Sequence, residues 1–463
     1  MPHLILLLLL LSLSVLTSCQ GTKERLIKDE PKALPNIVLI IGDDHGYPYF
    51  GFTGADYVFT PNMDALAASS ALFTNAYVPQ NHCRPSLQTL MTATLPTTYN
   101  KQVDSIMRAK MSLVRFDSEE SAEKWKKEFQ HHAMQYFETL PRKLAKLGYK
   151  SFQGGKWWEF NYQNGGFSHG MTTGWTEEDR KKGGKWFKQF MGGTGLQLAR
   201  ATMEPVYEFI DNNKENPFFI WYAPELPHYP FDAPGKYYDL YVDKDMTESA
   251  KRYYANCSWF DDGVGALMNY LKDEDLFSNT LFVYVNDNGW EQNPDQEFRH
   301  DSLRWHNGGD KGKLSVFDQS FRTPILFSWE GNINPGRFDN ALVHSADIPA
   351  TIMDILNLDQ NNNYGRSLLE MIESGKEMSH RDLIVGYVDK IRWEGDMMGK
   401  DVEAYWLREG NWFFSWNLTF SEKKLFDTRK DPGNELELSA KYPDLVDRFT
   451  DEIISWKKKI YEK

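Results

Sequence analysis

Cysteine is scarce in this chain: its 463 residues include three, Cys19, Cys83 and Cys257. Cys19 falls in an N-terminal targeting segment, so Cys83 and Cys257 could form one disulfide in an oxidising compartment. However, the apolar spacing around Cys257 predicts a helix, which favours a buried and inert thiol at that position. With Cys19 assigned to the targeting segment and Cys257 to a helix core, Cys83 is the cysteine whose role is still open.

Positive charge is also in short supply. The chain has 52 Lys and Arg against 65 Asp and Glu, a formal net charge of −13 at pH 7. This balance argues against a nucleic-acid partner, and it requires local cations wherever an anionic substrate binds. The sequence also contains no internal repeat and no low-complexity tract.

Aromatic residues, in contrast, are plentiful. They make up 14% of the chain and include 15 Trp. A large core uses such residues, and aromatic-rich clefts also suit the flat faces of sugars. With 463 residues and a hydrophobic fraction of 41%, the chain is long enough for a large globular domain and a second, smaller unit.

The N-terminus is typical of a targeting segment rather than of the fold. An apolar run, "LILLLLLLSLSVLTSC", ends in small residues before Cys19. Residues 16–19 resemble a bacterial lipobox, in which the cysteine becomes a lipidated N-terminus. The first three residues lack the lysine or arginine that is usual there, so an ordinary secretory signal is the alternative. We predict a signal over 1–19, a polar linker over 20–34, and an exported protein of the periplasm or cell surface. Its membrane contact would be a lipid on Cys19.

Short apolar runs that end in polar residues predict buried parallel strands: "NIVLII", "PFFIWYA", "TLFVYV" and "PILFSW". Helical patterns lie between them, which predicts an α/β fold with a mostly parallel sheet flanked by helices. We place this domain at 35–375, with a charged helical insertion at 101–138. The pattern then becomes short, aromatic and rich in turns, which predicts a smaller antiparallel subdomain over 376–463.

Acidic residues follow two of the predicted strands directly. Asp43 and Asp44 come after "NIVLII", and Asp287 and Asn288 come after "TLFVYV". Each group alone could be a helix cap or a turn. Because parallel strands bind ligands beyond their carboxyl ends, the two groups together indicate a shared, oxygen-ligated Ca²⁺ or Mg²⁺ site.

Cys83 opens the stretch "CRPSLQTLMTA", where Pro85 fits the first turn of a helix. A thiol at a helix N-terminus has a lowered pKa and a reactive character, because the helix dipole favours the thiolate. The alternative on these residues alone is a buried structural cysteine.

The sequence resembles the sulfatase family over nearly its whole length from Asn36. The blocks that carry the resemblance follow in family order: "NIVLIIGDDHGY", "TPNMDALAASSALFTNAY", "CRPSLQTLMTA", "TLPRKLAKLGYKSFQGGKWW", "PFFIWYAPELPHYPFDAP", "WFDDGVGALMNYL", "TLFVYVNDNG", "KLSVFDQSFRTP" and "SADIPATIMDIL". The resemblance implies an alkaline-phosphatase-like fold, with a large, mostly parallel central sheet and a smaller C-terminal antiparallel sheet.

The resemblance also implies a catalytic site. Cys83 would be oxidised by a maturation enzyme to formylglycine, whose hydrated aldehyde attacks sulfur and then expels sulfate. The metal, usually Ca²⁺, would be held at Asp43, Asp44, Cys83, Asp287 and Asn288. The cationic residues that hold sulfate and assist the leaving oxygen would be Lys156, His228 and Lys313, with Lys311 as an alternative to Lys313.

The chain departs from the family pattern at three positions. Leu87 stands where the signature Cys-x-Pro-Ser-Arg has arginine, Ala93 stands in place of a glycine, and Trp158 stands where histidine is usual. Trp158 could instead stack on a sugar or aryl ring of the substrate. Other residues that could supply a missing polar contact are Arg84, His169, His300 and His306.

The resulting hypothesis is a sulfuric ester hydrolase that removes sulfate from a sulfated carbohydrate or a similar ester. Hydrolysis of a phosphodiester or phosphonate ester on the same fold is one alternative. A catalytically silent protein that binds sulfated glycans is the other.

Overall fold

The computed structural model describes residues 34–183, 185–290, 311–359, 364–391 and 400–461. The predicted signal at 1–19, Cys19, most of the linker, His300 and His306 therefore lie outside the described residues. From Leu34 onward the described residues form one compact unit. Within these ranges, no helix has the length and apolarity that crossing a membrane requires.

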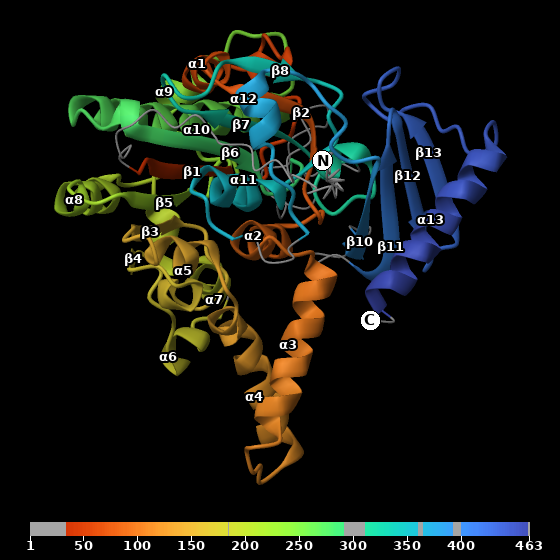
Figure 1. Cartoon of the computed structure of the whole chain (residues 1–463), viewed down its shortest axis with the longest axis horizontal. Helices are drawn as coiled ribbons and strands as arrows, with labels where there is room; N and C mark the ends of the chain where they lie inside the picture. The colour runs from red at the N-terminus through yellow and green to blue at the C-terminus, as the bar shows by residue number, and fades with distance from the viewer. Residues whose placement is uncertain (1–33, 184, 291–310, 360–363, 392–399, 462–463) are drawn as a thin grey trace, which may run out of the picture. The chain divides into compact units, whose positions relative to one another are not determined.

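A nine-stranded sheet forms the centre of this unit (Figure 1). The strand order is β4-β3-β5-β1-β6-β7-β2-β8, and β9 also pairs with β2. Strand β7 runs antiparallel to both of its neighbours, β6 and β2, and the other pairs are parallel. The strands are β1 (Asn36–Gly42), β2 (Ala71–Tyr77), β3 (Lys150–Gly155), β4 (His169–Gly170), β5 (Phe218–Ala223), β6 (Thr280–Asn286), β7 (Arg322–Ser328), β8 (Gly336–Phe338) and β9 (Val343–His344).

Strand β1 illustrates why the sequence folds this way. All seven of its residues are buried, and successive side chains alternate between the two faces of the sheet. Leu39 and Ile41 belong to the apolar cluster on one face, and Val38 and Ile40 to the cluster on the other. A continuous apolar run of this kind has no polar face to offer to solvent, so it needs helices on both sides.

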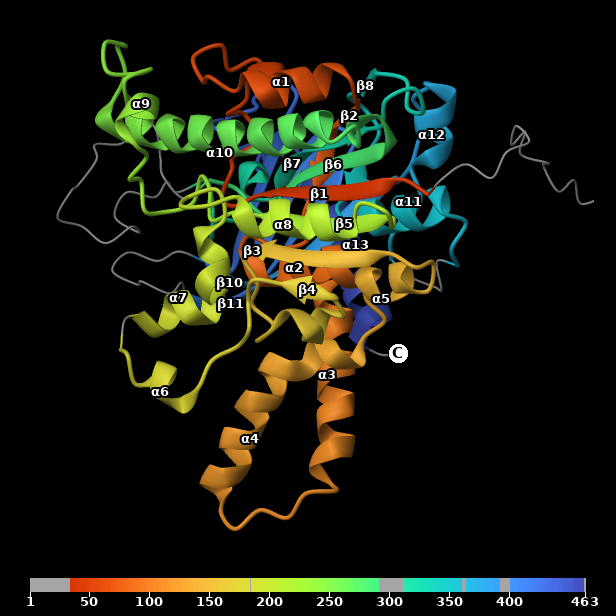
Figure 2. The same ribbon diagram turned by 90° about the vertical axis from the view of Figure 1, so that its left-hand side faces the viewer.

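Helices cover both faces (Figures 1 and 2). One apolar cluster receives side chains from α1 (Pro61–Ala68), α8 (Glu204–Asn213) and α10 (Glu248–Asp273). The other receives side chains from α2 (Cys83–Thr92), α5 (Leu140–Ala145) and α11 (Asp347–Ile355). The shorter helices are α6 (Glu177–Arg180), α7 (Lys185–Met191), α9 (Gly235–Tyr238) and α12 (Leu369–Ser374).

The charged segment 101–138 lies in a helical hairpin. Its helices are α3 (Pro96–Met111) and α4 (Glu119–His132), and they extend away from the central sheet in Figures 1 and 2. The side chain of Ser118 caps α4 by accepting a hydrogen bond from the Ser121 amide.

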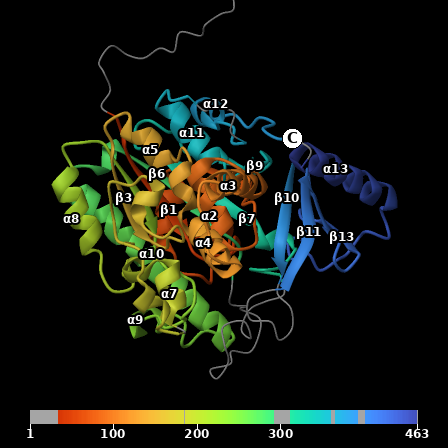
Figure 3. The ribbon, with the colours of Figure 1, turned by 90° about the horizontal axis from the view of Figure 1, so that it is seen from below.

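A second, antiparallel sheet follows in the C-terminal part of the chain (Figure 3). Its strands are β10 (Leu383–Ile391), β11 (Lys400–Glu409), β12 (Trp412–Asn417) and β13 (Glu422–Asp427), and helix α13 (Pro443–Tyr461) comes after them. One face packs on α13 through residues that include Phe414 and Phe449. The other face joins the main core through Trp406 and Phe413.

The predicted fold class is therefore confirmed: a large, mostly parallel sheet is flanked by helices, and a smaller antiparallel sheet follows it. The possible disulfide does not form, because Cys83 and Cys257 are both free and buried. Cys257 lies on α10 with no exposed surface, in agreement with an inert core thiol.

A buried ion pair connects α11 with the segment that leads into the second sheet. Asp347, at the first position of α11, is fully buried and pairs with Arg381 and with His380 Nε2 at 3.1 Å. Burial alone would raise the pKa of Asp347, but Arg381 and the hydrogen bond from His380 lower it below its ordinary value. The carboxylate therefore stabilises the fold above its unfolded-state pKa, and this contribution is lost in acid.

We expect Asp347→Asn to lower the free energy of unfolding by about 3 kcal/mol, because the buried guanidinium of Arg381 would lose its charged partner. Urea unfolding followed by intrinsic fluorescence measures this change. Asp243→Asn, at an exposed position before α10, is the matched control and should change the free energy by less than about 0.5 kcal/mol. Equal effects at the two positions would contradict this role of the ion pair.

Candidate active site

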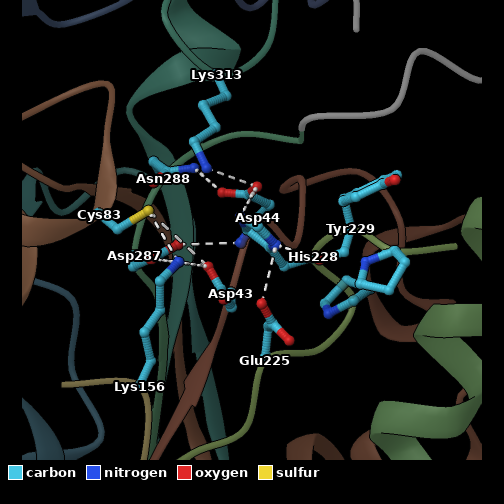
Figure 4. Close-up of polar contacts among 12 residues, drawn as sticks. Asp43, Asp44, Cys83, Lys156, Glu225, His228, Tyr229, Asp287, Asn288 and Lys313 are labelled. Carbon is cyan, nitrogen blue, oxygen red and sulfur yellow. Dashed lines mark hydrogen bonds and ion pairs between the residues drawn. The ribbon is translucent and has the colours of Figure 1, made fainter. Parts of the chain in front are cut away.

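The parallel pairing of β1 and β6 brings the two predicted acidic groups together. Gly42 at the end of β1 is in register with Asn286 at the end of β6, so the residues after them lie side by side. The Asp44 amide donates to Asp287 Oδ1 at 3.0 Å, and Asn288 Nδ2 donates to Asp44 Oδ1 at 2.7 Å (Figure 4). These side chains are all almost completely buried.

Cys83 joins this cluster from the start of α2. Its side chain is 5% exposed, and its Sγ lies 4.0 Å from Asp43 Oδ1. One ligand atom from each of Asp43, Asp44, Cys83 and Asp287 lies within 4.8 Å of the others. The structure therefore brings together the set predicted for the metal, including Asp44 and Asn288, which are 244 positions apart in the chain.

Three predicted cationic residues surround the cluster (Figure 4). Lys156 follows β3, and its Nζ lies 2.5 Å from Asp43 Oδ1 and 3.0 Å from Cys83 Sγ. Lys313 Nζ lies 2.8 Å from Asp44 Oδ2, and His228 Nε2 lies 3.5 Å from the same oxygen. Lys311, the alternative to Lys313, instead donates to Gly433 O at 2.8 Å and pairs with Glu435.

The orientation of His228 follows from its neighbours. Its Nδ1 lies 2.6 Å from the Tyr229 carbonyl oxygen, which can only accept, so Nδ1 must carry the proton. Nε2 therefore faces Asp44, as an acceptor in the neutral ring and as a donor in the protonated ring. This is the arrangement that a proton-transfer group needs.

Burial and charge set the protonation of the cluster. Burial raises the pKa of Asp43 well above its ordinary value, Lys156 opposes this, and the Asp287 and Asp44 carboxylates add to it. Burial would lower the pKa of Lys156, but the charge of Asp43 and of the groups around it raises it well above its ordinary value, so this residue stays an ammonium. The charge of the lysines alone therefore does not offset the burial of Asp43, which needs further positive charge, such as a bound cation, to stay ionised.

The expected lowering of the thiol pKa at Cys83 does not occur. Burial raises the pKa of this thiol far more than Lys156 and Lys313 lower it. The helix dipole that the sequence pattern invokes is a weaker effect than desolvation at a position 5% exposed. A protonated thiol is a poor nucleophile, so reactivity here calls for a modified side chain.

The oxygen atoms of the cluster fit a hard divalent cation. Asp43 Oδ2, Asp287 Oδ2 and Asn288 Oδ1 are buried and have no hydrogen-bond partner among the described residues. A buried acceptor without a donor is costly, and carboxylate and amide oxygens are the ligands that Ca²⁺ and Mg²⁺ prefer. The donor set therefore matches such an ion.

The two family departures nearest to the cluster form part of the core. Leu87 is 4% exposed and Trp158 is 9% exposed, and both belong to the same apolar cluster. The Trp158 ring meets Phe187 and Phe190 edge-on, at 5.7 and 5.1 Å between centroids, and lies 5.6 Å below Lys156 Nζ. Its position lets it shape the wall beside Lys156 more than it offers an open face to a ring.

The third departure, Ala93, ends α2. Its φ of 55° and ψ of 23° lie in the left-handed region, which glycine adopts freely and alanine adopts at a cost of about 1 kcal/mol. This backbone geometry explains why glycine suits the position in the family that the sequence resembles.

Arg84 and His169 do not supply the missing contacts. Arg84 points to Glu159, with its Nε 2.9 Å from Oε1 and its Nη2 3.0 Å from Oε2. His169 lies exposed on β4, at the outer edge of the central sheet, where its ring contacts Phe209.

Glu159 is a residue of this site region that the sequence patterns did not single out. It is 2% exposed, lies three positions after Lys156, and accepts hydrogen bonds from Arg84 and from Gln88 Nε2 at 2.9 Å. Because Arg84 and Gln88 belong to α2, Glu159 holds the start of this helix, and with it Cys83, against the Lys156 segment. The available signal was an acidic residue directly after the two tryptophans in "KWWEF".

We expect Glu159→Leu to lower the free energy of unfolding by about 2 kcal/mol or more, because Arg84 would keep a largely buried charge without its partner. Arg84→Met with Glu159→Leu should recover part of this loss, since the double variant removes both charges. A double-mutant cycle measured by urea unfolding should give a coupling of at least about 1 kcal/mol. Additive effects would show that the pair does not tie the two segments together.

Known proteins resemble this chain in sequence. A sequence model of the Sulfatase family matches residues 35–358, and one described as N-sulphoglucosamine sulphohydrolase, C-terminal, matches residues 309–459. A choline-sulfatase of Rhizobium meliloti (strain 1021) is 25% identical, over 90% of this chain and 84% of its own. An N-acetylgalactosamine-6-sulfatase of Homo sapiens is 23% identical, over the same shares of 90% and 84%.

A solved structure agrees at the level of the fold. Ps i-CgsB in complex with k-i-k-neocarrahexaose has a TM-score of 0.66 and 21% identity, and the match covers 91% of this chain and 92% of that one. The family match runs over most of the chain and contains Cys83, the acidic cluster and its three cationic neighbours. The chain therefore belongs to the sulfatase family of sulfuric ester hydrolases.

Proposed function

We propose that this chain removes sulfate from a sulfated carbohydrate, with a formylglycine made from Cys83 as the nucleophile and a divalent cation, Ca²⁺ or Mg²⁺, in the acidic cluster. The observation that supports it best is the position of Cys83. Its Sγ lies 3.0 Å from the Lys156 ammonium, at the edge of a group of three buried carboxylates. As an unmodified, protonated thiol it would be a poor nucleophile there.

The residues around position 83 suit attack on a sulfate ester. A formylglycine at position 83 would supply, as its hydrate, one hydroxyl oxygen to attack sulfur and a second to expel sulfate afterwards. A cation bound to Asp43, Asp44, Asp287 and Asn288 would hold sulfate oxygens and favour ionisation of the attacking hydroxyl. Lys156, fixed beside position 83, stabilises the negative charge that develops on the transferred group.

His228 and Lys313 suit the departure of the alcohol. Both approach Asp44 Oδ2, at 3.5 and 2.8 Å, whereas Lys156 approaches Asp43. The Nε2 of a protonated His228 can donate its proton to the ester oxygen as the sulfur–oxygen bond breaks. Lys313 adds positive charge close to the same oxygen.

The choice of a sulfated carbohydrate rests on relatives and composition. One relative is named for action on N-acetylgalactosamine 6-sulfate groups, and a structure of the same fold holds a neocarrahexaose. The 14% aromatic content is consistent with sugar-binding surfaces. The N-terminal pattern adds to the proposal an exported lipoprotein of the periplasm or cell surface, anchored through Cys19 and matured by a formylglycine-generating enzyme.

We expect Cys83→Ala to reduce hydrolysis of an aryl sulfate by at least about 1000-fold, because no other side chain can replace the nucleophile. Cys257→Ala, which removes the other described cysteine from the core, is the matched control and should keep activity within about twofold. Turnover of aryl phosphonate and phosphodiester substrates by the parent protein should be weaker than turnover of the aryl sulfate. Full activity of the Cys83 variant would exclude the formylglycine mechanism.

Mass spectrometry of the peptide over residues 80–93, from protein made in its own host, completes this test. An aldehyde at position 83 is the expected result. A plain thiol in every preparation, together with glycan binding and no sulfate release, would instead identify a silent binding protein.

A further inference from the structure

The segment that carries His228, residues 224–230, runs between β5 and α9 and contains three prolines. Proline has no N–H, so the segment has few donors for its own carbonyl groups. Residues 224–228 are buried, and buried carbonyl oxygens need donors from elsewhere in the chain. One donor comes from the catalytic cluster itself, where the Asp43 amide donates to the Leu226 carbonyl at 3.0 Å.

Arg200 supplies several of the other donors. Its Nε donates to the Glu225 carbonyl at 2.7 Å, and its Nη2 donates to the carbonyls of His228 at 2.7 Å and Pro230 at 3.1 Å. Its Nη1 donates to the Asp232 carboxylate at 2.6 Å. Because the guanidinium is a planar fork of five N–H donors, one arginine can hold several carbonyl groups in a fixed relative position.

Asn256, on α10, contacts the same segment. Its Nδ2 lies 3.2 Å from the Pro227 carbonyl oxygen, 3.3 Å from that of His228 and 3.0 Å from that of Pro230. The Asn256 side chain has no exposed surface. The carbonyl group of His228 therefore receives donors from two side chains that come from distant parts of the chain.

The direction of the His228 ring follows from this backbone. Its Nδ1 donates to the Tyr229 carbonyl at 2.6 Å, so the ring turns with the peptide group of residue 229. Tyr229 lies between His228 and Pro230, and both side chains described above contact the carbonyl groups of these two residues. Held in this way, Nε2 faces the catalytic cluster (Figure 4).

The charge of Arg200 is compensated locally. Its guanidinium pairs with Asp232 at 2.6 Å, and its Nε lies 3.6 Å from Glu225 Oε2. It also lies 5.2 Å from the centre of the Trp259 ring, and its side chain is only 11% exposed. A cation paired in this way is not directed at a sulfate group, so its contribution is the position of the segment that it holds.

We propose that Arg200 and Asn256 are positioning residues for His228, which hold residues 225–230 so that Nε2 points to the leaving oxygen of the ester. The inference rests on the role proposed above for His228. As the sulfur–oxygen bond breaks, its electron pair stays on the leaving oxygen, which takes the proton from Nε2. A shift of the ring by about 1 Å impairs this transfer, while Lys156 and the acidic cluster still bind the sulfate group.

The test uses two esters that differ in their need for a proton. 4-Nitrophenyl sulfate releases a stabilised phenolate, whereas phenyl sulfate releases a more basic one that gains more from protonation. We expect Arg200→Met to lower kcat on phenyl sulfate at least about tenfold more than on 4-nitrophenyl sulfate, with KM changed less than about threefold. Asn256→Ala should show the same selectivity with a smaller loss, because Arg200 still holds two of the three carbonyl groups.

Arg142→Met is the matched control. Arg142, on α5, also donates to backbone carbonyls, those of Phe137 at 3.0 Å and Asn164 at 2.9 Å, in another part of the fold. Its loss should change kcat on the two esters by the same factor, because it does not hold the His228 segment. His228→Gln is the reference and should discriminate between the esters at least as strongly as Arg200→Met.

Equal losses on the two esters in Arg200→Met and Asn256→Ala, or losses confined to KM, would overturn the inference and leave the proposed function intact. If His228→Gln itself treated the two esters alike, the proposed role of His228 would be wrong, and the inference with it. Absence of hydrolysis of both esters by the parent protein would contradict the proposed function, whose own test uses an aryl sulfate, and the inference that rests on it.

Discussion

The structure of the site depends on charge compensation among three buried carboxylates. Asp43, Asp44 and Asp287 follow the ends of two adjacent strands and are shielded from water, where like charges repel strongly. Lys156 and Lys313 each place an ammonium against one of them, at 2.5 and 2.8 Å. Acceptor atoms that are still without donors leave room for a cation as well. Without this positive charge, desolvation would favour protonation of the acids and the site would lose its negative character.

This constraint explains why the chain needs so large a scaffold. The two lysines and Cys83 come from three separate connections of the central sheet, and each has to reach the same point to within an ångström or so. Parallel strands achieve this because their carboxyl ends meet at one edge, while helices on both faces hold them in place. The C-terminal segment lies next to this edge. Lys311, Asp318 and Gln319 donate hydrogen bonds to its loop after β13 and hold the loop in place.

The parts of the fold that depend on local pattern could be predicted from the sequence. The run "NIVLII" indicates a strand buried on both faces, and Asp43 directly after it indicates the edge of the sheet where a ligand binds. Both features can be read from a few consecutive residues. The pairing of Glu159 with Arg84 could not be predicted, since it joins residues 75 positions apart and no periodic pattern marks it. The thiol pKa of Cys83 was predicted with the wrong sign, because helix position is visible in a sequence and desolvation is not. The burial of Trp158 depends in the same way on Phe187 and Phe190, which lie about 30 residues further along the chain.

The replacement of the signature arginine by Leu87 changes the charge of the site rather than its architecture. Leu87 joins the apolar core, and the nearby Arg84 directs its charge to Glu159, so neither contributes to the cluster. Three carboxylates, two ammonium groups and the proposed divalent cation then leave one net positive charge. A sulfate ester carries a single negative charge and would neutralise it, whereas a phosphate monoester carries nearly two at neutral pH. In the proposed mechanism, protonation of His228 adds one positive charge, and transfer of this proton to the leaving alcohol removes that charge as the sulfur–oxygen bond of the ester breaks. The loss of the arginine is therefore compatible with turnover of a singly charged ester, and in the proposed mechanism it leaves Lys156, Lys313 and His228 as the side chains that supply positive charge to the transition state.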